Sequence, residues 1–419
     1  MLPNFLFNTA LFLIWFMLLY HMFLMQGGFL HALKYRKTVE EWERKNKELP
    51  TVSILIPAHN EEMVIKDTIN AMINLNYPKD KLEVIIINDN SSDGTGVIAD
   101  KYAKEHSFLK VLHTKPPHAG KGKSGALNQG LKLSKGKFIV VYDADNTPEQ
   151  DAVYHLAMGL QNDAKAGAVV GKFRVINGAK NLLTNFINIE TITFQWLAQA
   201  GRWYWFKLST IPGTNFAIRR SILEKLGGWD EKALSEDTEL SIRVYNLGYH
   251  IRFFPAAITW EQEPETWKVW WKQRTRWARG NQYVIGKYLL RFFKLKNKKV
   301  FLDLIYFLFT YLLFLCGVLV SDSLLILNLF TDLNLSVSPV STALLILAIL
   351  LYITEVLLAL SIEKQQLNLK NILIVALMYF TYSQIWIILV VHSLYLEFKR
   401  ILFKQEIKWY KTERYKKSA

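Results

Sequence analysis

Hydrophobic residues follow two different patterns along the chain. Long apolar runs with few charges occupy residues 9–25, 304–320, 343–360 and 372–391. Each run is close to the roughly 20 residues that a helix needs to cross a bilayer core. The block from 51 to 262 has no such run and alternates short apolar stretches with polar segments of helical length, as water-soluble α/β domains do. The pattern predicts membrane helices on both sides of one soluble domain.

Four Val/Ile-rich stretches in the soluble block predict a mostly parallel sheet. They are VSILIP at 52–57, EVIIIND at 83–89, KVLHT at 110–114 and FIVVYDAD at 138–145. Helical segments separate them, so the order predicts βαβ units whose ligands gather at the carboxyl ends of the strands. The polar residues at those ends are His59, Asn60 and Glu61, then Asp89, and finally Asp143 with Asp145.

Each of these polar residues also has a purely structural interpretation. Asn60 could cap a helix that starts near Glu61, and residues 90–94 have ordinary turn composition. However, carboxylates at one sheet edge repel each other unless a cation or a donor-rich ligand lies there. Asp143 and Asp145, at positions i and i+2, could share Mg²⁺ or Mn²⁺ with nucleotide phosphates, although a lone Asp-x-Asp also arises readily by chance.

Two further polar segments each allow two interpretations. Residues 120–125, GKGKSG, could bring Lys121 or Lys123 near phosphates or could form a solvated loop. In LSEDTELSIRVYNLGY at 234–249, Ser235 is placed as a helix N-cap. Glu236 and Asp237 then lie in the first turn, where they either stabilise the helix dipole or supply a general base.

Two aromatic segments flank the end of the soluble block. In 264–284, Trp and Arg residues recur at three- and four-residue steps, which suits the headgroup layer of a membrane. The same segment could bind a diphosphate through Gln273, Arg274 and Arg276 while Trp277 stacks on a sugar ring. Residues 185–206 predict either an interfacial helix below a channel or a buried helix of the soluble domain.

Charge and cysteine content favour a membrane protein with its soluble domain in the cytosol. The formal net charge is +15, but much of the excess lies beside the apolar runs, at 34–37 and 411–417, which favours a membrane surface over nucleic acid. The single Cys316 excludes a disulfide framework. The first run is interpreted as a retained helix, because no small-residue cleavage site follows it. The basic 34–47 segment and the basic tail predict conflicting topologies, which the sequence leaves open.

Taken in order, several motifs resemble the processive family 2 glycosyltransferases, which include cellulose, hyaluronan, chitin-oligosaccharide and poly-N-acetylglucosamine synthases. The nearest resemblance is to bacterial poly-N-acetylglucosamine synthase and related Bacillus and Listeria exopolysaccharide synthases. It covers residues 50–290 closely, with departures at His59, Asn90 and Ser235, where Tyr, Asp and Thr are common. The motifs are HNE at 59–61, NDNSSDGTG at 88–96, KSGALN at 123–128, DAD at 143–145, GTNF at 213–216, SED at 235–237 and QRTRW at 273–277.

The resemblance implies an α/β GT-A fold, a Rossmann-like mixed sheet in a cytosolic domain, with transmembrane and interfacial helices. It implies that Asp237 is the general base and that Asp143 and Asp145 manage a Mg²⁺ or Mn²⁺ diphosphate. The remaining roles implied are Glu61 and Asp89 on the uridine, Lys123 near the nucleotide, Gly213, Thr214 and Asn215 at the acceptor, Gln273 and Arg276 on the pyrophosphate, and Trp277 under the terminal sugar.

These observations predict five regions. They are a transmembrane helix at 1–33, the GT-A domain at 50–262, an interfacial QRTRW region at 263–295, transmembrane helices at 301–397 and a basic tail at 398–419. The tail is too short for a cyclic-di-GMP-binding barrel, so any such control requires an accessory or cyclic-di-GMP-sensing membrane partner. The expected location is the cell membrane, with several spans and a cytoplasmic catalytic domain.

The predicted function is processive, inverting polymerisation of a UDP-activated sugar, an N-acetylhexosamine, into an exopolysaccharide that crosses the membrane. The expected partners are the UDP-sugar, the growing polysaccharide and the lipid bilayer, without nucleic acid. One alternative is a non-processive enzyme that adds one sugar to a lipid-phosphate carrier. Another is a transporter with a nucleotide-binding domain. Such a protein would carry polar residues inside its spans, and the few that occur there, such as Asp322 and Glu355, disfavour it.

Overall fold

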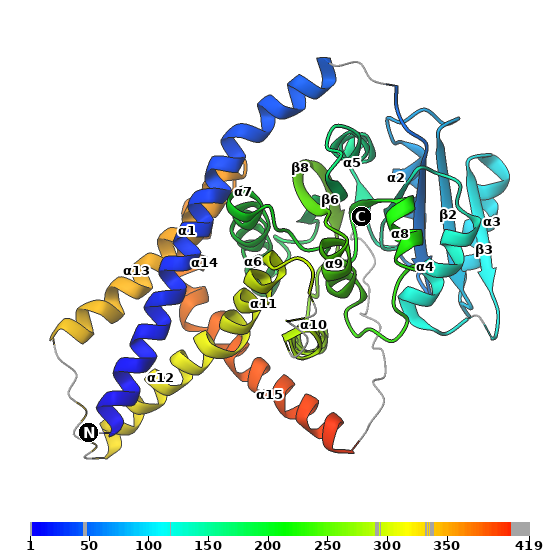
Figure 1. Cartoon of the computed structure of the whole chain (residues 1–419). Helices are drawn as coiled ribbons and strands as arrows, with labels where there is room; N and C mark the ends of the chain where they lie inside the picture. The colour runs from blue at the N-terminus through cyan, green and yellow to red at the C-terminus, as the bar shows by residue number, and fades with distance from the viewer. Residues whose placement is uncertain are drawn as a thin grey trace.

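Eight strands form one mixed sheet at the centre of the soluble part of the chain (Figure 1). The computed structural model describes residues 2–44, 48–117, 119–289, 293, 295–331, 333, 335 and 339–403. Within these residues the strands lie in the order β3-β2-β1-β4-β7-β6-β8-β5. Their bounds are β1 Val52–Ala58, β2 Leu82–Asp89, β3 Leu109–Thr114, β4 Phe138–Val141, β5 Thr147–Pro148, β6 Ala166–Val175, β7 Phe216–Arg219 and β8 His250–Glu261.

The first half of the sheet is parallel, as the sequence pattern predicts. β1 lies between β2 and β4 and pairs parallel with both, while β2 pairs parallel with β3. Successive residues of these strands point to opposite faces and both faces are buried, which explains their continuous apolar composition. β4 ends at Val141, so Asp143 and Asp145 lie in the turn that follows it. The predicted α/β mixed sheet is therefore confirmed.

The second half of the sheet reverses direction, and this reversal assembles the site. β7 pairs antiparallel with β4 and with β6, and β6 pairs parallel with β8. Because β7 runs antiparallel to β4, the loop that precedes β7 lies at the carboxyl end of β4. The GTNF segment at 213–216 is thereby brought beside the DAD segment at 143–145.

Helices cover both faces of the sheet and pack in two apolar cores. One core lies under α2, α3 and α5, and the other lies under α4, α8, α9 and the helices that lead to the apolar spans. The soluble helices are α2 Ile65–Ile73, α3 Thr95–Glu105, α4 Gly122–Leu133, α5 Ala152–Gln161, α6 Leu182–Thr193, η1 Phe194–Gly201, α7 Arg202–Phe206, α8 Arg220–Lys225, α9 Glu236–Asn246 and α10 Trp267–Leu289.

Among the residues that the structure describes, three helical segments are long and apolar enough to cross a membrane, which indicates a membrane protein. They are Leu2–Arg44, Pro339–Ile362 and Leu369–Phe403, and the shorter Phe314–Phe330 is also apolar. The first, α1, continues as one helix beyond residue 33. Residues 404–419 of the predicted basic tail lie outside the described residues. The remaining elements are α11 Lys299–Leu308, η3 Phe309–Leu313, α12 Phe314–Phe330, α13 Pro339–Ile362, α14 Leu369–Phe380 and α15 Tyr382–Phe403.

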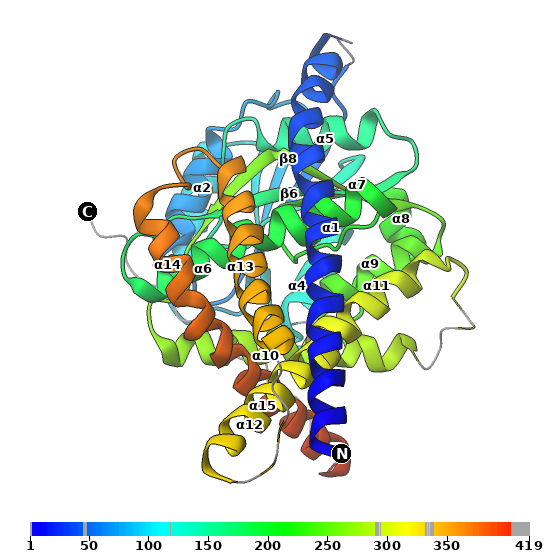
Figure 2. The same ribbon diagram turned by 90° about the vertical axis from the view of Figure 1, so that its left-hand side faces the viewer.

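The aromatic segment predicted at 185–206 is mostly buried. It forms α6, η1 and α7, and it packs between the sheet and α1, which crosses in front of it in Figure 2. The contact is close because two glycines lie in it: a Cβ on Gly28 would meet the Trp196 carbonyl oxygen at 2.0 Å, and one on Gly201 would meet the Leu24 carbonyl oxygen at 2.1 Å. Trp196 is 1% exposed, although Trp205 reaches the surface. The buried alternative therefore describes most of this segment.

Candidate active site

Asp89 stands at the carboxyl end of β2 and is held there by its neighbours. Its Oδ1 accepts hydrogen bonds from the Thr114 hydroxyl at 2.6 Å and from the Gly120 backbone N–H at 3.2 Å. Its backbone oxygen lies 2.6 Å from His59 Nδ1. The ends of β1, β2 and β3 therefore converge on this residue, as the parallel arrangement predicts.

The loops after β1 and β2 interlock through asparagines rather than through a helix cap. Asn60 and Asn90 both have left-handed backbones, with φ of 55° and 53°, a region that asparagine tolerates better than most residues. The Asn60 side-chain oxygen accepts from the Ser92 N–H at 2.7 Å. Because α2 begins only at Ile65, the helix-cap interpretation of Asn60 is wrong. Glu61 is held in the same loop by its N–H, which donates to Thr95 Oγ1 at 2.7 Å.

Lys123 is the charged centre of the site. It lies on α4, and its Nζ donates to Asp143 Oδ1 at 2.5 Å and to the Gly213 carbonyl at 3.0 Å. Burial alone would lower the pKa of Lys123, but the charges of Asp143, Glu236 and Asp237 outweigh it and raise that pKa. Lys123 therefore stays cationic among three carboxylates. Lys121, the other lysine of the glycine-rich segment, points elsewhere: its Nζ lies 3.7 Å from Glu231 Oε2.

The Asp143–Asp145 turn is fixed by its backbone. The Asp143 N–H donates to Thr214 Oγ1 at 3.0 Å, and the Ala144 carbonyl accepts from the Thr68 hydroxyl at 2.7 Å. The Thr214 hydroxyl in turn donates to Asn146 Oδ1. Both aspartates are half-buried. The turn is thus held rigidly while its carboxylates stay at the edge of the sheet.

Thr214 and Asn215, predicted at the acceptor, contact the chain itself. Asn215 is fully buried with φ of 48°, and its Nδ2 donates to the carbonyls of Lys172 at 2.9 Å and Ala257 at 3.0 Å. These bonds link the start of β7 to β6 and β8, so the Asn215 side chain stabilises the sheet in this structure. Gly213 differs: its φ is +87°, and a Cβ there would lie 3.0 Å from Asp237 Oδ2 and 3.4 Å from Lys123 Nζ. A glycine lets these charged groups approach each other.

Asp237 presents one carboxylate oxygen to this centre. Its Oδ1 accepts from the Ser235 hydroxyl at 2.8 Å and from the Thr238 N–H at 2.6 Å, whereas its Oδ2 faces Gly213. Ser235 occupies the predicted N-cap position of α9 but makes no capping bond, because its hydroxyl is used on Asp237. Beside it, burial and the Asp237 charge raise the pKa of Glu236. The first turn of α9 therefore does more than stabilise the helix dipole.

Helix α10 places the QRTRW segment next to α9. A Cβ on Gly280 would lie 3.0 Å from Ser235 Cβ, so α10 and the SED segment are in direct contact. Burial and the Asp237 charge raise the pKa of Glu236, and the Arg276 charge opposes them in part. Arg276 is therefore near Glu236. Trp277 is 41% exposed, and the centre of its ring lies 4.0 Å from the Arg274 guanidinium carbon. Arg276 thus lies near the charged centre, while Trp277 lies on the accessible part of α10.

Arg274 and Gln273, predicted on the substrate, lie in the interior instead. The Arg274 guanidinium is 1% exposed, 2.9 Å from Glu190 Oε2 and 3.6 Å from Glu263 Oε2. It donates to Gln273 Oε1 at 2.5 Å. These carboxylates raise the pKa of Arg274 although burial opposes them. In this structure the side chain joins α10 to α6.

Two residues that support the site, Glu190 and Tyr382, are not predicted by the sequence motifs. Glu190 Oε2 also accepts from the Tyr382 hydroxyl at 2.8 Å, which itself accepts from Trp270 Nε1 at 2.9 Å. α6, α10 and α15 are joined through this network. Glu190 is recognisable as a carboxylate inside an apolar segment, but Tyr382 carries no comparable signal. The N-cap pattern at Ser235 gives no indication that its hydroxyl contacts Asp237.

Comparison with known proteins agrees with this geometry. Residues 53–227 match the family model described as Glycosyl transferase family 2. The chain is 67% identical over 412 residues to the probable glycosyltransferase YdaM of Bacillus subtilis, covering 98% of each. It is 31% identical over 265 residues to the poly-beta-1,6-N-acetyl-D-glucosamine synthase of Staphylococcus epidermidis, covering 63% of this chain and 62% of that relative.

A solved structure shows the same fold across nearly the whole chain. It is the mannosyltransferase PcManGT from Pyrobaculum calidifontis, in complex with GDP-Man and Mn²⁺. The TM-score is 0.57 at 21% identity, over 93% of this chain and 99% of that chain. With its GT-A-like sheet and these relatives, the chain belongs to glycosyl transferase family 2 and is a glycosyltransferase.

Proposed function

We propose that the enzyme is a processive, inverting glycosyltransferase that polymerises a UDP-activated N-acetylhexosamine and passes the polymer across the membrane. The observation that carries this proposal is the meeting of Lys123, Asp143, Gly213 and Asp237 from four separate segments. The similarity to poly-beta-1,6-N-acetyl-D-glucosamine synthase supports the sugar class. The chain spans 62% of the length of that relative, and the aligned part is where such a site would lie.

The carboxyl edge of the parallel strands suits a nucleotide sugar. Asp89 and Glu61 would hold the uridine, with Asp89 kept in place by Thr114 and Gly120. Lys123 would exchange part of its contact with Asp143 for the diphosphate, because a buried ammonium group binds phosphate oxygens strongly. Arg276, on the accessible part of α10, would bind the departing diphosphate.

The Asp143–Asp145 turn fits a divalent cation that a nucleotide brings with it. Among the described residues no three His, Cys, Asp or Glu side chains form a ready-made metal cluster. Mg²⁺ and Mn²⁺ at nucleotide sites use one or two protein carboxylates and complete their shell with phosphate oxygens and water. Asp143 and Asp145 would hold the ion, which would neutralise charge on the leaving diphosphate.

Asp237 would act as the general base. Ser235 and Thr238 hold its Oδ1, so Oδ2, which faces Gly213, would accept the proton of the acceptor hydroxyl. The acceptor oxygen forms a bond to the anomeric carbon as the bond from that carbon to the diphosphate oxygen breaks. UDP leaves, and an α-linked donor becomes a β-linked product.

The position of α10 supports processivity. Its exposed Trp277, the residue after Arg276, would stack under the terminal sugar of the chain. The helix also contacts α15, because Trp270 donates a hydrogen bond to the Tyr382 hydroxyl and Gln282 donates one to the Ser393 hydroxyl. A polymer leaving Trp277 would therefore start next to a candidate membrane span. A cytoplasmic catalytic domain follows, because UDP-sugars are made in the cytosol.

The test is product size. The purified full chain in lipid nanodiscs is incubated with a panel of radiolabelled UDP-sugars and Mg²⁺ or Mn²⁺. Wild type is compared with Asp237→Asn and with the control Asp80→Asn. Asp80 is exposed and precedes β2, at the end of that strand away from Asp89. We expect a long polymer from one N-acetylhexosamine donor, made by wild type and Asp80→Asn and absent with Asp237→Asn. Single-sugar lipid products would instead identify a non-processive enzyme that uses a lipid-phosphate acceptor.

A further inference from the structure

A cavity of about 850 Å³ lies at the opposite end of the sheet from the active site. Its walls come from residues 31–38 of α1, from α7, from the first residues of β8 and from residues 297–299. β6 and β8 begin here, with Ala166 paired to His250. Since β6 runs in the same direction as β4, this is the amino edge of the sheet. The cavity is therefore separate from the Lys123 centre.

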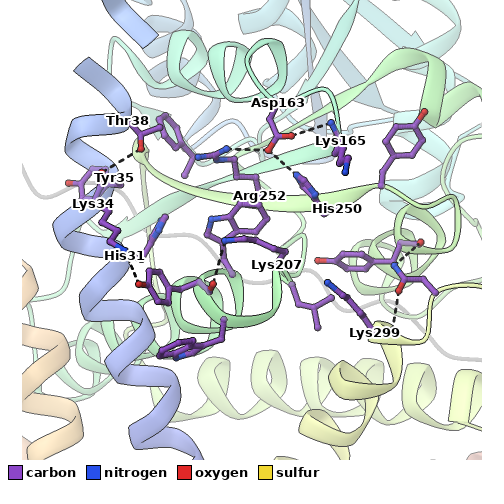
Figure 3. A pocket seen from close by; sticks show the side chains of 18 of the residues that line it. His31, Lys34, Tyr35, Thr38, Asp163, Lys165, Lys207, His250, Arg252 and Lys299 are labelled. Carbon is purple, nitrogen blue, oxygen red and sulfur yellow. Dashed lines mark hydrogen bonds and ion pairs between the residues drawn. The ribbon is translucent and has the colours of Figure 1, made fainter. Parts of the chain in front are cut away.

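Positive charge dominates the wall of this cavity. Asp163 is the single carboxylate among its described lining residues, and it is already engaged, because His250 Nε2 lies 2.9 Å and Arg252 Nη1 lies 3.2 Å from its Oδ2 (Figure 3). Within the part of the chain that the structure describes, no carboxylate lies within 4.0 Å of the side-chain nitrogens of the lining lysines. These are Lys34, Lys165, Lys207 and Lys299.

The positive charges lie close enough to affect one another. Burial lowers the pKa of Lys207, and the charge of Arg252 lowers it further, with a smaller effect from Lys299. Lys34 donates to the Tyr204 hydroxyl at 3.0 Å, which leaves its charge without an opposite charge. His31 is 7% exposed, and its Nε2 has no hydrogen-bond partner among the described residues. The cavity thus offers several donors and excess positive charge to an anion.

The cavity lies where α1 passes from lipid-facing to polar composition. Exposed apolar side chains on α1 include Phe23, Phe29 and Leu33, and Lys34 follows directly. Trp205 stacks on Phe23 with ring centroids 4.7 Å apart and donates its Nε1 hydrogen to the Phe23 carbonyl at 2.9 Å. Aromatic and basic residues of this kind lie at the level of lipid headgroups. An anion at this depth meets both the protein and the membrane surface.

We propose that this cavity binds the phosphate group of an anionic phospholipid headgroup. Lys165, Lys207 and Lys299 supply the charge, Tyr204 and His31 supply hydrogen-bonding groups, and the acyl chains would leave along the apolar surface of α1. The bound headgroup would bridge α1 to the amino edge of the sheet. The same phosphate chemistry exists in small soluble phosphates, but the depth of the cavity beside Phe23 and Leu33 favours the lipid.

The test measures binding without any sugar donor, so it does not depend on the proposed function. The full chain in a neutral detergent is titrated by calorimetry with short-chain phosphatidylglycerol, with short-chain phosphatidylcholine and with glycerol 3-phosphate. Two variants are compared with wild type. One is the triple variant Lys165→Gln, Lys207→Gln and Lys299→Gln; the control triple variant is Lys101→Gln, Lys104→Gln and Lys132→Gln, at exposed lysines on the soluble helices α3 and α4.

We expect saturable binding of one phosphatidylglycerol per chain, weaker by about tenfold to hundredfold in the cavity variant and unchanged in the control. Phosphatidylcholine should not saturate. Equal binding by the cavity variant, or equal binding of both lipids, overturns the proposal. Binding of glycerol 3-phosphate as tight as the lipid would overturn the lipid as the source and keep the phosphate site. The matching Lys→Arg triple variant keeps the charge and should retain binding, which separates loss of the site from misfolding.

Discussion

The two ends of the sheet handle charge in opposite ways. At the carboxyl edge Lys123 lies among three carboxylates, of which Asp143 is 2.5 Å away. At the amino edge the one described carboxylate in the cavity, Asp163, is shared by His250 and Arg252, and several lysines are left over. An acidic edge with one lysine suits a ligand that brings its own cation, such as a metal–nucleotide complex. A basic cavity suits an anion that arrives without one.

The comparison also shows how a membrane enzyme of this kind is held together. Both edges contact a candidate membrane span: α10 meets α15 at one edge, and α7 meets α1 at the other. Both contacts use tryptophans whose ring N–H groups donate to a neighbouring helix. The soluble domain therefore contacts candidate membrane spans near both edges of its sheet.

The largest expected effect concerns Arg274, next to the carboxyl edge. Replacing it with Met should lower the free energy of unfolding by about 3–5 kcal/mol, because Glu190 and Glu263 would be left buried with one another. Denaturant unfolding in detergent, followed by tryptophan fluorescence, measures this. Lys268→Met, at an exposed site on the same helix, is the control and should change stability far less. A normal stability with a weakened donor affinity would contradict the structural assignment and restore Arg274 to the substrate.

Lys123 tests the charge balance of the carboxyl edge directly. We expect Lys123→Gln to lower the rate of sugar transfer by about 10²–10³-fold, since a positioned donor to the diphosphate is lost. Lys121→Gln is the matched control, because Lys121 lies two residues away and contacts Glu231 instead. The initial rate of UDP release in nanodiscs gives both values. Wild-type rates for both variants would show that neither lysine contacts the donor.

Ser235 is a positioning residue for Asp237, and its loss should be milder. Removing its hydroxyl in Ser235→Ala should lower the rate about tenfold to hundredfold, the usual range for a hydrogen bond to a charged group. The loss should fall on kcat rather than on KM, because the Ser235 hydroxyl contacts the proposed base and not the donor. Ser235→Thr keeps the hydroxyl and should restore kcat. An unchanged kcat in the alanine variant would reduce Ser235 to a packing role.

The smallest expected effect lies at the amino edge. Burial would raise the pKa of Asp163, but the hydrogen bond to His250 and the charge of Arg252 outweigh it and lower that pKa from 3.8 to about 2. Its stabilising contribution is therefore complete above pH 3.8 and lost as the pH falls towards 2. Unfolding midpoints between about pH 5 and pH 2 should fall more steeply for wild type than for Asp163→Asn. Parallel curves would contradict the Asp163 pairing.

Much of the candidate site is recognisable as short motifs in the amino-acid sequence. HNE and DAD follow strand ends and SED opens a helix, as local patterns predict, while QRTRW lies inside the helix Trp267–Leu289. These positions depend on the residues immediately around them. The motifs predict that Arg274 and Asn215 contact the substrate, yet the structure engages both with the chain itself. A motif preserves the order of its residues but does not say which side of a helix or loop each one occupies.

The sequence by itself determined the alternation of strands and helices, the parallel half of the sheet and the apolar segments, since these follow from side-chain periodicity and from runs of apolar residues. Only the tertiary structure decided that β7 returns antiparallel beside β4 and brings Gly213 to Lys123 and Asp237. It also decided that 182–206 is buried against α1 through Gly28 and Gly201, and that a basic cavity forms at the amino edge. The physical reason is that these contacts join residues far apart in the chain. They depend on how strands and helices pack in three dimensions, which local preference does not specify.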